Sequence, residues 1–492
     1  MNITNTYRTR LVAAAATGLL ALSLGAGTAM AKTTGENIAD VEDTSVTING
    51  LQANDTVSAW SIADALIDST NNLTYTMASG LPEAYDSVEE LAAITSDSDA
   101  AKEAANAIAA VLVGSNATVT ATANDGGAAT LTLDSGYYLV TVTSTSGKTV
   151  LYQNMLIDAT PTAGTDGNYG VRTISDVTVK KSDVTAPDKK VVEGTGENSS
   201  MADSTDSYSV GDTATFQITG VIPSYPSNAT HATYRVTDTP ASGLEVDDAT
   251  FAVTMGSGES AKKLVKDADF TVSSTDGKYT INFSNPISLA GQTYTITYSA
   301  KVTAVDATDG TVTNKAHATF NPNPYVDSTV DTGDDPATVK TYGFVFTKVG
   351  GTDQAPLPGA QFQVKDAAGN VVKDASGSEI TLTSDKNGYV YLGGLESGTY
   401  TITETKVPAG YQKVEDFTVT LDKTTANTDN PATGSITETN YLVKAEKVVD
   451  PKQGVLPTTG GEGTVALTAA GVVLMAGAAG FVVLARRRNS NR

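Results

Sequence analysis

Apolar and polar residues alternate with a period of two along most of this chain. The runs Thr280–Phe283 and Tyr294–Tyr298 show the pattern, and Asp-Gly and Asn-Gly pairs at 276–277 and 387–388 separate such runs. This alternation predicts strands with one buried face, and these dipeptides predict tight turns between them. We therefore expect a mainly β protein made of β-sandwich domains.

Helical periodicity is confined to two stretches near the N-terminus, Ser58–Ser69 and Ser87–Val113. Trp60, the only tryptophan, lies in the apolar register of the first stretch. We predict helices in both stretches and expect Trp60 to be a core residue rather than a carbohydrate platform.

Each end of the chain carries a targeting pattern. Residues 1–31 have a positive start, an Ala/Leu-rich run and a small-x-small site, as in a cleaved signal peptide. Val465–Ala485 is an uncharged run long enough for a transmembrane helix, and Arg486–Arg488 follows it directly. We expect a secreted chain whose C-terminal end is held at the membrane.

Polar, Pro-containing or acidic stretches suggest the domain boundaries. The seams are Lys181–Pro187 and the acidic stretch Asp327–Thr338, and Lys444–Gly454 is interpreted as a stalk. The predicted units are a signal peptide at 1–31, an N-terminal domain at 32–181, a middle β-sandwich at 182–332, a third β-sandwich at 339–447, and an anchor region at 448–492.

Composition narrows the function further. The 492 residues carry a net charge of −23, which disfavours nucleic-acid binding. The chain has two histidines and no cysteine, so disulfides, metal centres and Ser/His/Asp or Cys/His catalytic sets are not expected. The acidic pairs Asp247-Asp248 and Asp334-Asp335 lack the ligand spacing of a calcium loop. We predict no cofactor, no metal site and no enzymatic activity.

The pentapeptide Leu456-Pro457-Thr458-Thr459-Gly460 precedes the apolar run and its arginines. This order resembles the cell-wall sorting signal (LPXTG) of Gram-positive surface proteins. The resemblance implies that a sortase cuts between Thr459 and Gly460 and transfers the Thr459 carbonyl to an amine.

The third domain resembles the Cna-B type domains of Gram-positive surface proteins. The resemblance rests on the strand Phe344–Val349, on Leu357–Phe362, and on Tyr400–Thr405 followed by Pro408–Tyr411. It implies an intramolecular isopeptide bond between Lys348 and Asn440, promoted by Glu404. Alternation places Lys348 on the face of Phe344 and Phe346. Burial there would favour a neutral amine and a protonated acid, which is the state needed for amide formation.

The middle domain repeats the order lysine, acid, asparagine and resembles the isopeptide-forming domain of backbone pilins. The resemblance implies a bond from Lys189 to Asn314 with Asp238 as the promoting acid. Lys190 is the competing lysine, because a register slip of one residue exchanges the faces of a strand. Lys189 shares a face with Val191, which favours it.

The seam between the first two domains carries Val177-Thr178-Val179-Lys180-Lys181. Backbone pilins place a sortase-reactive lysine here, usually within a Val-x-Val-Tyr-Pro-Lys pattern, from which this sequence departs. Alternation turns Val177 and Val179 inward and Lys180 outward, which favours Lys180 as the intersubunit residue, with Lys181 as the alternative.

Together these patterns are typical of tandem Ig-like or Cna-type β-sandwiches in a major pilin, the shaft subunit of a covalent fimbria anchored in the cell wall and supporting adhesion. The expected partners are pilin-specific and housekeeping sortases, identical subunits, ancillary tip and base pilins, peptidoglycan, and host or environmental receptors. The alternative is a cell-wall-anchored adhesin or ancillary pilin that is not polymerised.

Overall fold

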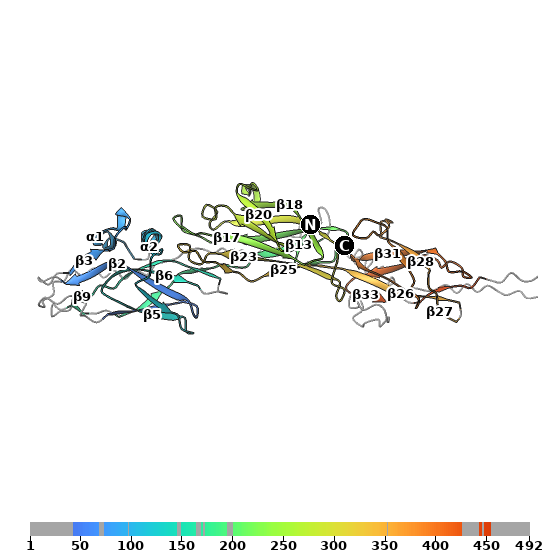
Figure 1. Ribbon diagram of the computed structural model, residues 1–492, viewed down its shortest axis with the longest axis horizontal. Helices are drawn as coiled ribbons and strands as arrows, with labels where there is room; N and C mark the ends of the chain where they lie inside the picture. The colour runs from blue at the N-terminus through green and yellow to red at the C-terminus, as the bar shows by residue number, and fades with distance from the viewer. Residues whose placement is uncertain are drawn as a thin grey trace, which may run out of the picture.

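The computed structural model describes residues 43–67, 73–96, 98–144, 149–163, 169–170, 173–193, 200–351, 353–425, 442–444 and 447–453. They form three β-rich bodies that follow one another along the long axis of the molecule (Figure 1). We call them the N-terminal body (residues 43–183), the middle body (188–340) and the C-terminal body (342–453). The mainly β architecture predicted from the alternation is confirmed.

The N-terminal body has two main sheets, with strand orders β11-β1-β5 and β3-β2-β6-β8 and with β4 also paired to β2. Helices α1 (Val88–Ala92) and α2 (Asp99–Leu112) pack on the second sheet. The short pairs β9–β10 and β7–β12 complete it. The strands are β1 (Thr44–Asn49), β2 (Thr56–Ile67), β3 (Leu73–Met77), β4 (Val119–Thr122), β5 (Ala128–Leu133), β6 (Gly136–Thr143), β7 (Val150–Tyr152), β8 (Met155–Asp158), β9 (Thr162–Ala163), β10 (Tyr169–Gly170), β11 (Thr173–Thr178) and β12 (Lys181–Asp183).

The prediction of a helix over Ser58–Ser69 is wrong, because Thr56–Ile67 is strand β2. One face of β2 packs into the core between the two sheets and the other packs against the helices, so apolar residues occur on both faces. A register shift between Ser61 and Ala63 also changes the phase of the alternation. Trp60 is a core residue, as expected, with 7% of its surface exposed.

The prediction of helix over Ser87–Val113 is confirmed by α1 and α2, with a break between them. Ser87 and Ser98 cap the two helices through side-chain oxygens that accept the backbone N–H groups of Glu90 and Ala101.

The middle body is a sandwich of two sheets. Their strand orders are β14-β13-β16-β22-β18-β19 and β15-β25-β23-β17-β21-β20, with β24 paired to β23. The hairpin of β20 and β21 turns at Asp276 and Gly277, both with positive φ, as the Asp-Gly pair predicts. The strands are β13 (Asp188–Glu193), β14 (Ser200–Ala202), β15 (Ser204–Thr205), β16 (Thr213–Val221), β17 (Tyr234–Pro240), β18 (Leu244–Met255), β19 (Lys262–Lys263), β20 (Phe270–Thr275), β21 (Lys278–Phe283), β22 (Thr293–Val302), β23 (Thr311–Phe320), β24 (Val330–Asp331) and β25 (Asp335–Lys340).

The C-terminal body is a smaller sandwich. One sheet has the order β27-β26-β30, with β33 and β34 paired in parallel to β26, and the other has the order β29-β28-β31-β32. Its strands are β26 (Tyr342–Gly350), β27 (Ala355–Pro356), β28 (Gln361–Lys365), β29 (Thr381–Thr383), β30 (Tyr389–Leu395), β31 (Gly398–Lys406), β32 (Phe417–Leu421), β33 (Leu442–Lys444) and β34 (Val448–Asp450).

Two stretches differ from their interpretation as a linker and a stalk. Within Asp327–Thr338, strands β24 and β25 pair with β23, so these residues belong to the middle sandwich. Within Lys444–Gly454, strand β34 pairs with β26 and ends in the buried Asp450. The acidic composition of the first stretch and the position of the second before the pentapeptide suggested exposed connections, but pairing with strands β23 and β26 places both stretches in sheets.

Hydrogen bonds connect neighbouring bodies. Tyr325 of the middle body is buried in the core beside α2, and Asn228 Nδ2 of the middle body donates to Asn106 O of α2 at 2.8 Å. At the other joint, the N–H of Val210 donates to Gly394 O at 2.7 Å and that of Ser397 donates to Asp206 O at 2.9 Å. The three bodies are therefore joined by direct contacts.

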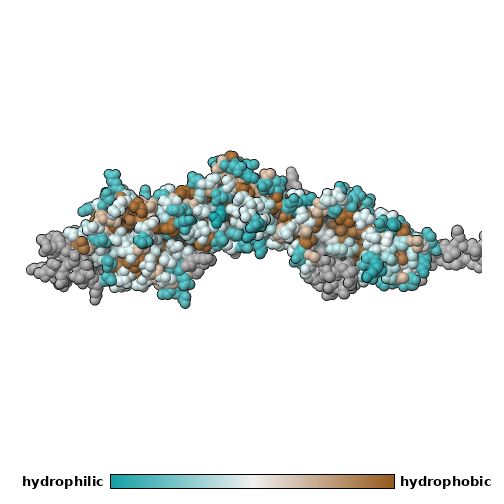
Figure 2. All heavy atoms as spheres, viewed as in Figure 1, coloured by the Kyte–Doolittle hydropathy of each residue, from teal (hydrophilic) through white to brown (hydrophobic). Residues whose placement is uncertain are grey.

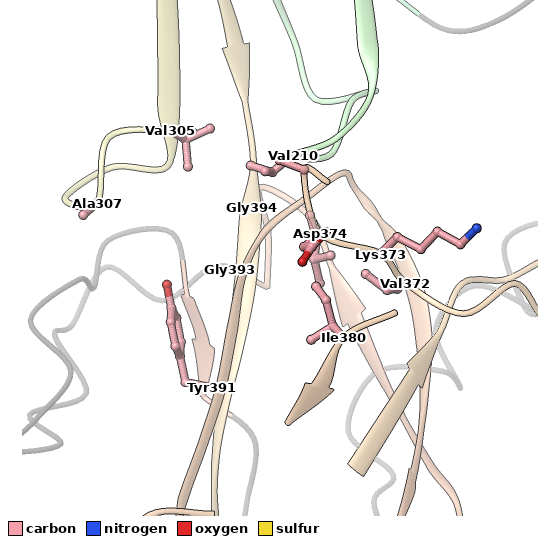
Figure 3. A pocket seen from close by; sticks show the side chains of 12 residues that line it. Val210, Val305, Ala307, Val372, Lys373, Asp374, Ile380, Tyr391, Gly393 and Gly394 are labelled. Atoms are coloured by element: carbon pink, nitrogen blue, oxygen red, sulfur yellow. The ribbon is translucent and has the colours of Figure 1, made fainter. Parts of the chain in front are cut away.

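The second joint contains a cavity of about 230 Å³ (Figure 3). Val210 and Val305 line it from the middle body, and Tyr391 and Ile380 line it from the C-terminal body. None of the predicted site residues lines it. On the face drawn in Figure 2, apolar residues are scattered among polar ones along the molecule.

Candidate cross-linking sites

The middle body brings Lys189, Asp238 and Asn314 together in its core. Lys189 comes from β13 in one sheet, whereas Asp238 on β17 and Asn314 on β23 come from adjacent strands of the other sheet. All three residues have 0% of their surface exposed. Strand alternation explains the placement, because each residue occupies an inward position of its strand.

Tyr298, on β22, completes this cluster and was not singled out from the sequence. Lys189 Nζ forms an ion pair with Asp238 Oδ1 and donates to the Tyr298 hydroxyl oxygen at 2.6 Å. Asn314 Nδ2 donates to the same hydroxyl oxygen at 2.7 Å and to Asp238 Oδ2 at 3.3 Å. The amine and the side-chain amide thus share two polar partners.

The surroundings of the cluster are apolar. Lys189 Nζ lies 5.1 Å from the ring centroid of Phe216, and the Tyr298 ring stacks on Phe251 with a centroid distance of 4.4 Å. Burial lowers the pKa of Lys189, and the charge and hydrogen bonds of Asp238 only partly oppose this. Burial also raises the pKa of Tyr298 well above its usual value, so this hydroxyl stays protonated. The site therefore shifts Lys189 towards the neutral, nucleophilic form of its amine, and Asn314 shares the partners Asp238 and Tyr298 with it.

Lys190, the competing lysine, lies elsewhere. Its side chain is 26% exposed and pairs with Asp203 and, at 2.8 Å, with Asp188 Oδ1. These two carboxylates raise the pKa of Lys190, although its partial burial is the largest single contribution and acts in the opposite direction. The buried lysine of β13 is Lys189.

The C-terminal body contains a second buried cluster. Lys348 of β26 and Glu404 of β31 are both buried, and Lys348 Nζ lies 3.6 Å from Glu404 Oε1. Burial raises the pKa of Glu404; a hydrogen bond from the Val414 N–H and the charge of Lys348 oppose this shift, whereas Asp450 adds to it. Alternation correctly places Lys348 inward with Phe344 and Phe346.

Asp450 is the third member of this second cluster, and it was missed because Lys444–Gly454 was interpreted as a stalk. Lys348 Nζ forms an ion pair with Asp450 Oδ1, and neither side chain is exposed. Val448 and Asp450 lie two positions apart, so a short strand here would turn both to the same face, and this spacing is the sequence signal that could have identified Asp450. Asn440, the predicted partner of Lys348, lies outside the described residues.

The seam lysines occupy different environments. Lys181, on β12, is exposed; its Nζ donates to Gly50 O at 2.7 Å and lies 5.9 Å from the ring centroid of Tyr152. Lys180 is half-buried, and its backbone oxygen accepts the N–H of Gln153. Val177 and Val179 point inward as predicted. However, strand β11 ends at Thr178 and strand β12 begins at Lys181, so the alternation of faces does not continue from one strand to the other. As a result, Lys181 is more exposed than Lys180.

Several predicted features lie outside the described residues. These are residues 1–31, Leu456, Pro457, Thr458, Thr459, Gly460 and the apolar run Val465–Ala485. Among helices of the described ranges, none has the length and apolarity needed to cross a membrane. Within the same ranges, no group of three or more His, Asp or Glu side chains could hold a metal ion.

Two parts of the chain match protein-family models. Residues 343–433 match the prealbumin-like fold domain of SpaA type, and residues 448–491 match the LPXTG cell wall anchor motif. The second match marks the chain as a cell-wall-anchored surface protein.

Two curated relatives are 27% identical to this chain. The trypsin-resistant surface T6 protein of Streptococcus pyogenes serotype M6 aligns over 271 residues, which cover 50% of this chain and 48% of that protein. The chain therefore spans about half the length of this relative. Fimbrial subunit type 2 of Actinomyces naeslundii aligns over 420 residues, which cover 75% of this chain and 73% of that protein.

Solved structures show the same fold. The T6 backbone pilin of serotype M6 S. pyogenes, described as a modular three-domain structure, matches with a TM-score of 0.63 and 18% identity, covering 86% of this chain and all of that one. The major pilin SpaA of Corynebacterium diphtheriae matches with a TM-score of 0.50 and 17% identity, covering 83% of this chain and all of that one.

The row of β-sandwiches with buried lysine–acid clusters and the C-terminal anchor motif together define a cell-wall-anchored surface protein. The chain is similar in sequence to a Gram-positive surface protein and a fimbrial subunit and has the fold of backbone pilins, and it carries a prealbumin-like domain and an LPXTG anchor motif.

Proposed function

We propose that this chain is the shaft subunit of a covalent pilus, in which a sortase joins the Thr459 carbonyl of one subunit to a seam lysine of the next. The proposal is carried by two matches found together in one chain. A fimbrial subunit aligns over 75% of the chain, and the C-terminal end matches the cell wall anchor motif. Such a head-to-tail contact does not close on itself and produces a filament.

The proposed acceptor amine belongs to a lysine at the seam between the N-terminal and middle bodies, where the sequence also predicts a domain boundary. Lys181 is the better candidate, because its ammonium is exposed and held on Gly50 O. A lysine already held in one geometry loses less side-chain entropy when an enzyme captures it. Lys180, which alternation favoured, remains the alternative.

The middle body is proposed to be stiffened by an isopeptide bond from Lys189 to Asn314. The amine attacks Cγ of Asn314, the new C–N bond forms, and the bond from Cγ to the original amide nitrogen breaks. Asp238 carries the proton from the attacking amine to that nitrogen, which leaves as ammonia. The contacts of both reactants with Asp238 and Tyr298 support this reaction, because held reactants need no external catalyst.

The test of polymerisation is a denaturing gel of cell-wall extract from the producing organism, blotted with antibody to residues 32–459. A ladder that survives boiling in detergent is expected. The Lys181→Ala strain should lose the ladder and the Lys180→Ala strain should keep it. The reverse pattern would assign the linkage to Lys180, and a single band near the monomer mass in the wild type would overturn the shaft proposal in favour of an anchored adhesin.

A further inference from the structure

We propose that Tyr152 and Asp55 position the amine of Lys181 for capture by the sortase. Both are positioning residues, because they act through Lys181 and not on the Thr459 carbonyl. This role rests on the proposed use of Lys181 as the acceptor and adds to it the side chains that hold the amine. It gives the N-terminal body a part in joining the subunits.

Strand β7 connects the acceptor lysine to both bodies. Leu151 packs in the core of the middle body, whereas the next residue, Tyr152, packs in the core of the N-terminal body. Antiparallel pairing of β7 with β12 sets Lys181 directly opposite Tyr152. Directly opposite residues of such a pair share one face, so their side chains interact. The two cores therefore fix the strand beneath the lysine.

Two contacts hold the ammonium group of Lys181. Its Nζ donates to Gly50 O at 2.7 Å and lies 5.9 Å from the centroid of the Tyr152 ring, within the range of a cation–π contact. Gly50 has a φ of +81°, a conformation that favours glycine, and a Cβ there would lie 3.2 Å from Thr178 Cγ2. The amine is thus held by an aromatic face and by a carbonyl of a tightly turned loop, residues 50–55.

Asp55, at the end of this loop, is buried and holds both of these groups. The Tyr152 hydroxyl donates to Asp55 Oδ2 at 2.5 Å, and the Gln52 N–H donates to the same oxygen at 2.8 Å. Burial raises the pKa of Tyr152 and the hydrogen bond to Asp55 raises it further, so the hydroxyl keeps its proton and donates. One carboxylate oxygen therefore fixes the ring beneath Lys181 and the loop that presents Gly50 O.

The carboxylate of Asp55 has no counterion among the residues that the structure describes, whose ion pairs involve other acids. Its second oxygen, Oδ1, accepts the Ser144 hydroxyl at 3.5 Å. A buried carboxylate is costly unless it is hydrogen-bonded, and bonds to an ionised acceptor are shorter and stronger than neutral ones. An acid at this position is therefore explained by the hydrogen bonds that it accepts and not by an ion pair.

Holding the amine in one place favours the transfer step. The Lys181 nitrogen, as a neutral amine, bonds to the Thr459 carbonyl carbon while the bond from that carbon to the sortase cysteine sulfur breaks. The proton that the amine loses goes to the leaving thiolate. A positioned nucleophile reacts as if at high effective concentration, and a displacement of about 1 Å can cost about a hundredfold in rate.

The test uses cell-wall extracts of strains that each carry one substitution in the full chain, blotted as for the test of polymerisation. Tyr152→Phe keeps the ring but loses the contact with Asp55, so the fraction of chain in the ladder should fall severalfold. Asp55→Ala should lower this fraction about tenfold or more. Asp55→Asn should keep most of the ladder, because an amide oxygen can accept both bonds that Asp55 Oδ2 accepts.

Asp183→Ala is the matched control for Asp55→Ala. Asp183 is an exposed acid of β12, two positions after Lys181. It makes neither of the two contacts that hold the amine, so its removal should leave the ladder unchanged.

A second readout separates positioning from folding. In branched tryptic peptides that contain residues 453–459, the uncut bond shows which lysine is acylated, because trypsin does not cut after an acylated lysine. Misfolding would lower the whole ladder, whereas loss of positioning should also move the remaining linkage from Lys181 to Lys180. We expect the share of Lys180 linkage to rise in Tyr152→Phe and Asp55→Ala but not in Asp55→Asn.

The outcomes distinguish this role from the shaft proposal. Absence of a ladder in the wild type would overturn the shaft proposal and this role with it. A wild-type ladder linked through Lys181 that is unchanged in both Tyr152→Phe and Asp55→Ala would overturn the positioning role alone. Equal losses in Asp55→Ala and Asp55→Asn would also overturn it, because they would assign the effect to the charge of Asp55. Linkage of the wild type through Lys180 would leave the shaft proposal in place and overturn the positioning role.

Discussion

Lys189 and Asp238 reach each other from opposite sheets of the middle sandwich and form an ion pair with neither side chain exposed. Breaking such a pair by removing one partner is strongly destabilising, because it leaves an uncompensated charge in the core. A cross-link to Asn314 would avoid keeping the ammonium there as an ion. The Lys189–Asp238 contact therefore matters both for the stability of the middle sandwich and for the proposed cross-linking reaction.

Asn314→Ala should remove the proposed cross-link of the middle body while leaving Lys189 paired with Asp238. We expect the loss of about 17 Da assigned to this bond to disappear from the mass of the chain, and the free energy of unfolding to fall by about 2–5 kcal/mol, as for removal of a disulfide. Mass spectrometry and chemical denaturation measure the two effects. Lys190→Ala, which removes a lysine of the same strand whose side chain is 26% exposed, should keep both the mass deficit and the stability of the wild type. A wild-type chain whose mass equals the value calculated from its sequence would contradict the bond.

The unlinked Asn314→Ala variant should also gain stability as the pH rises towards 10. Burial lowers the pKa of Lys189 below its ordinary value of 10.5. Between the folded-state pKa and 10.5, the unfolded chain therefore binds more protons than the folded chain. Stability therefore increases with pH there and is lost as the pH falls through the folded-state pKa. Urea unfolding from pH 7 to 10, compared with the linked wild type, measures the difference. A difference that does not change with pH would contradict this prediction.

Tyr298→Phe should slow or prevent cross-linking in the middle body without abolishing folding. The hydroxyl is the shared partner of Lys189 Nζ and Asn314 Nδ2, while the ring supplies the stacking on Phe251. Phenylalanine keeps the ring and loses only the polar contacts. We expect a fraction of the purified chain to carry free Lys189, measured by peptide mapping. Complete cross-linking in this variant would show that the hydroxyl is dispensable.

Local sequence patterns were sufficient to predict much of the secondary structure and several of the buried residues of this protein. Period-two alternation indicated the β-sandwiches and placed Lys189, Asp238 and Lys348 inward, because a strand buried on one face repeats every second residue. The order of lysine, acid and asparagine in the middle domain named three residues that the fold brings together. The anchor motif depends on contiguous residues and could be read without any tertiary contact.

Other features depended on which segments pack together. Strand β2 is packed on both faces and contains a register shift. Its apolar residues therefore do not alternate strictly, and their spacing resembles that of a helix. Tyr298 joins the middle cluster through sheet-to-sheet packing, which no local pattern records. Asp450 lies in a stretch interpreted as a stalk, and only the parallel pairing of β34 with β26 buries it against Lys348. By itself the sequence determined which strands can form and which of their side chains face inward. The tertiary structure decided which inward side chains meet, because long-range sheet pairing leaves no periodic signal in the chain.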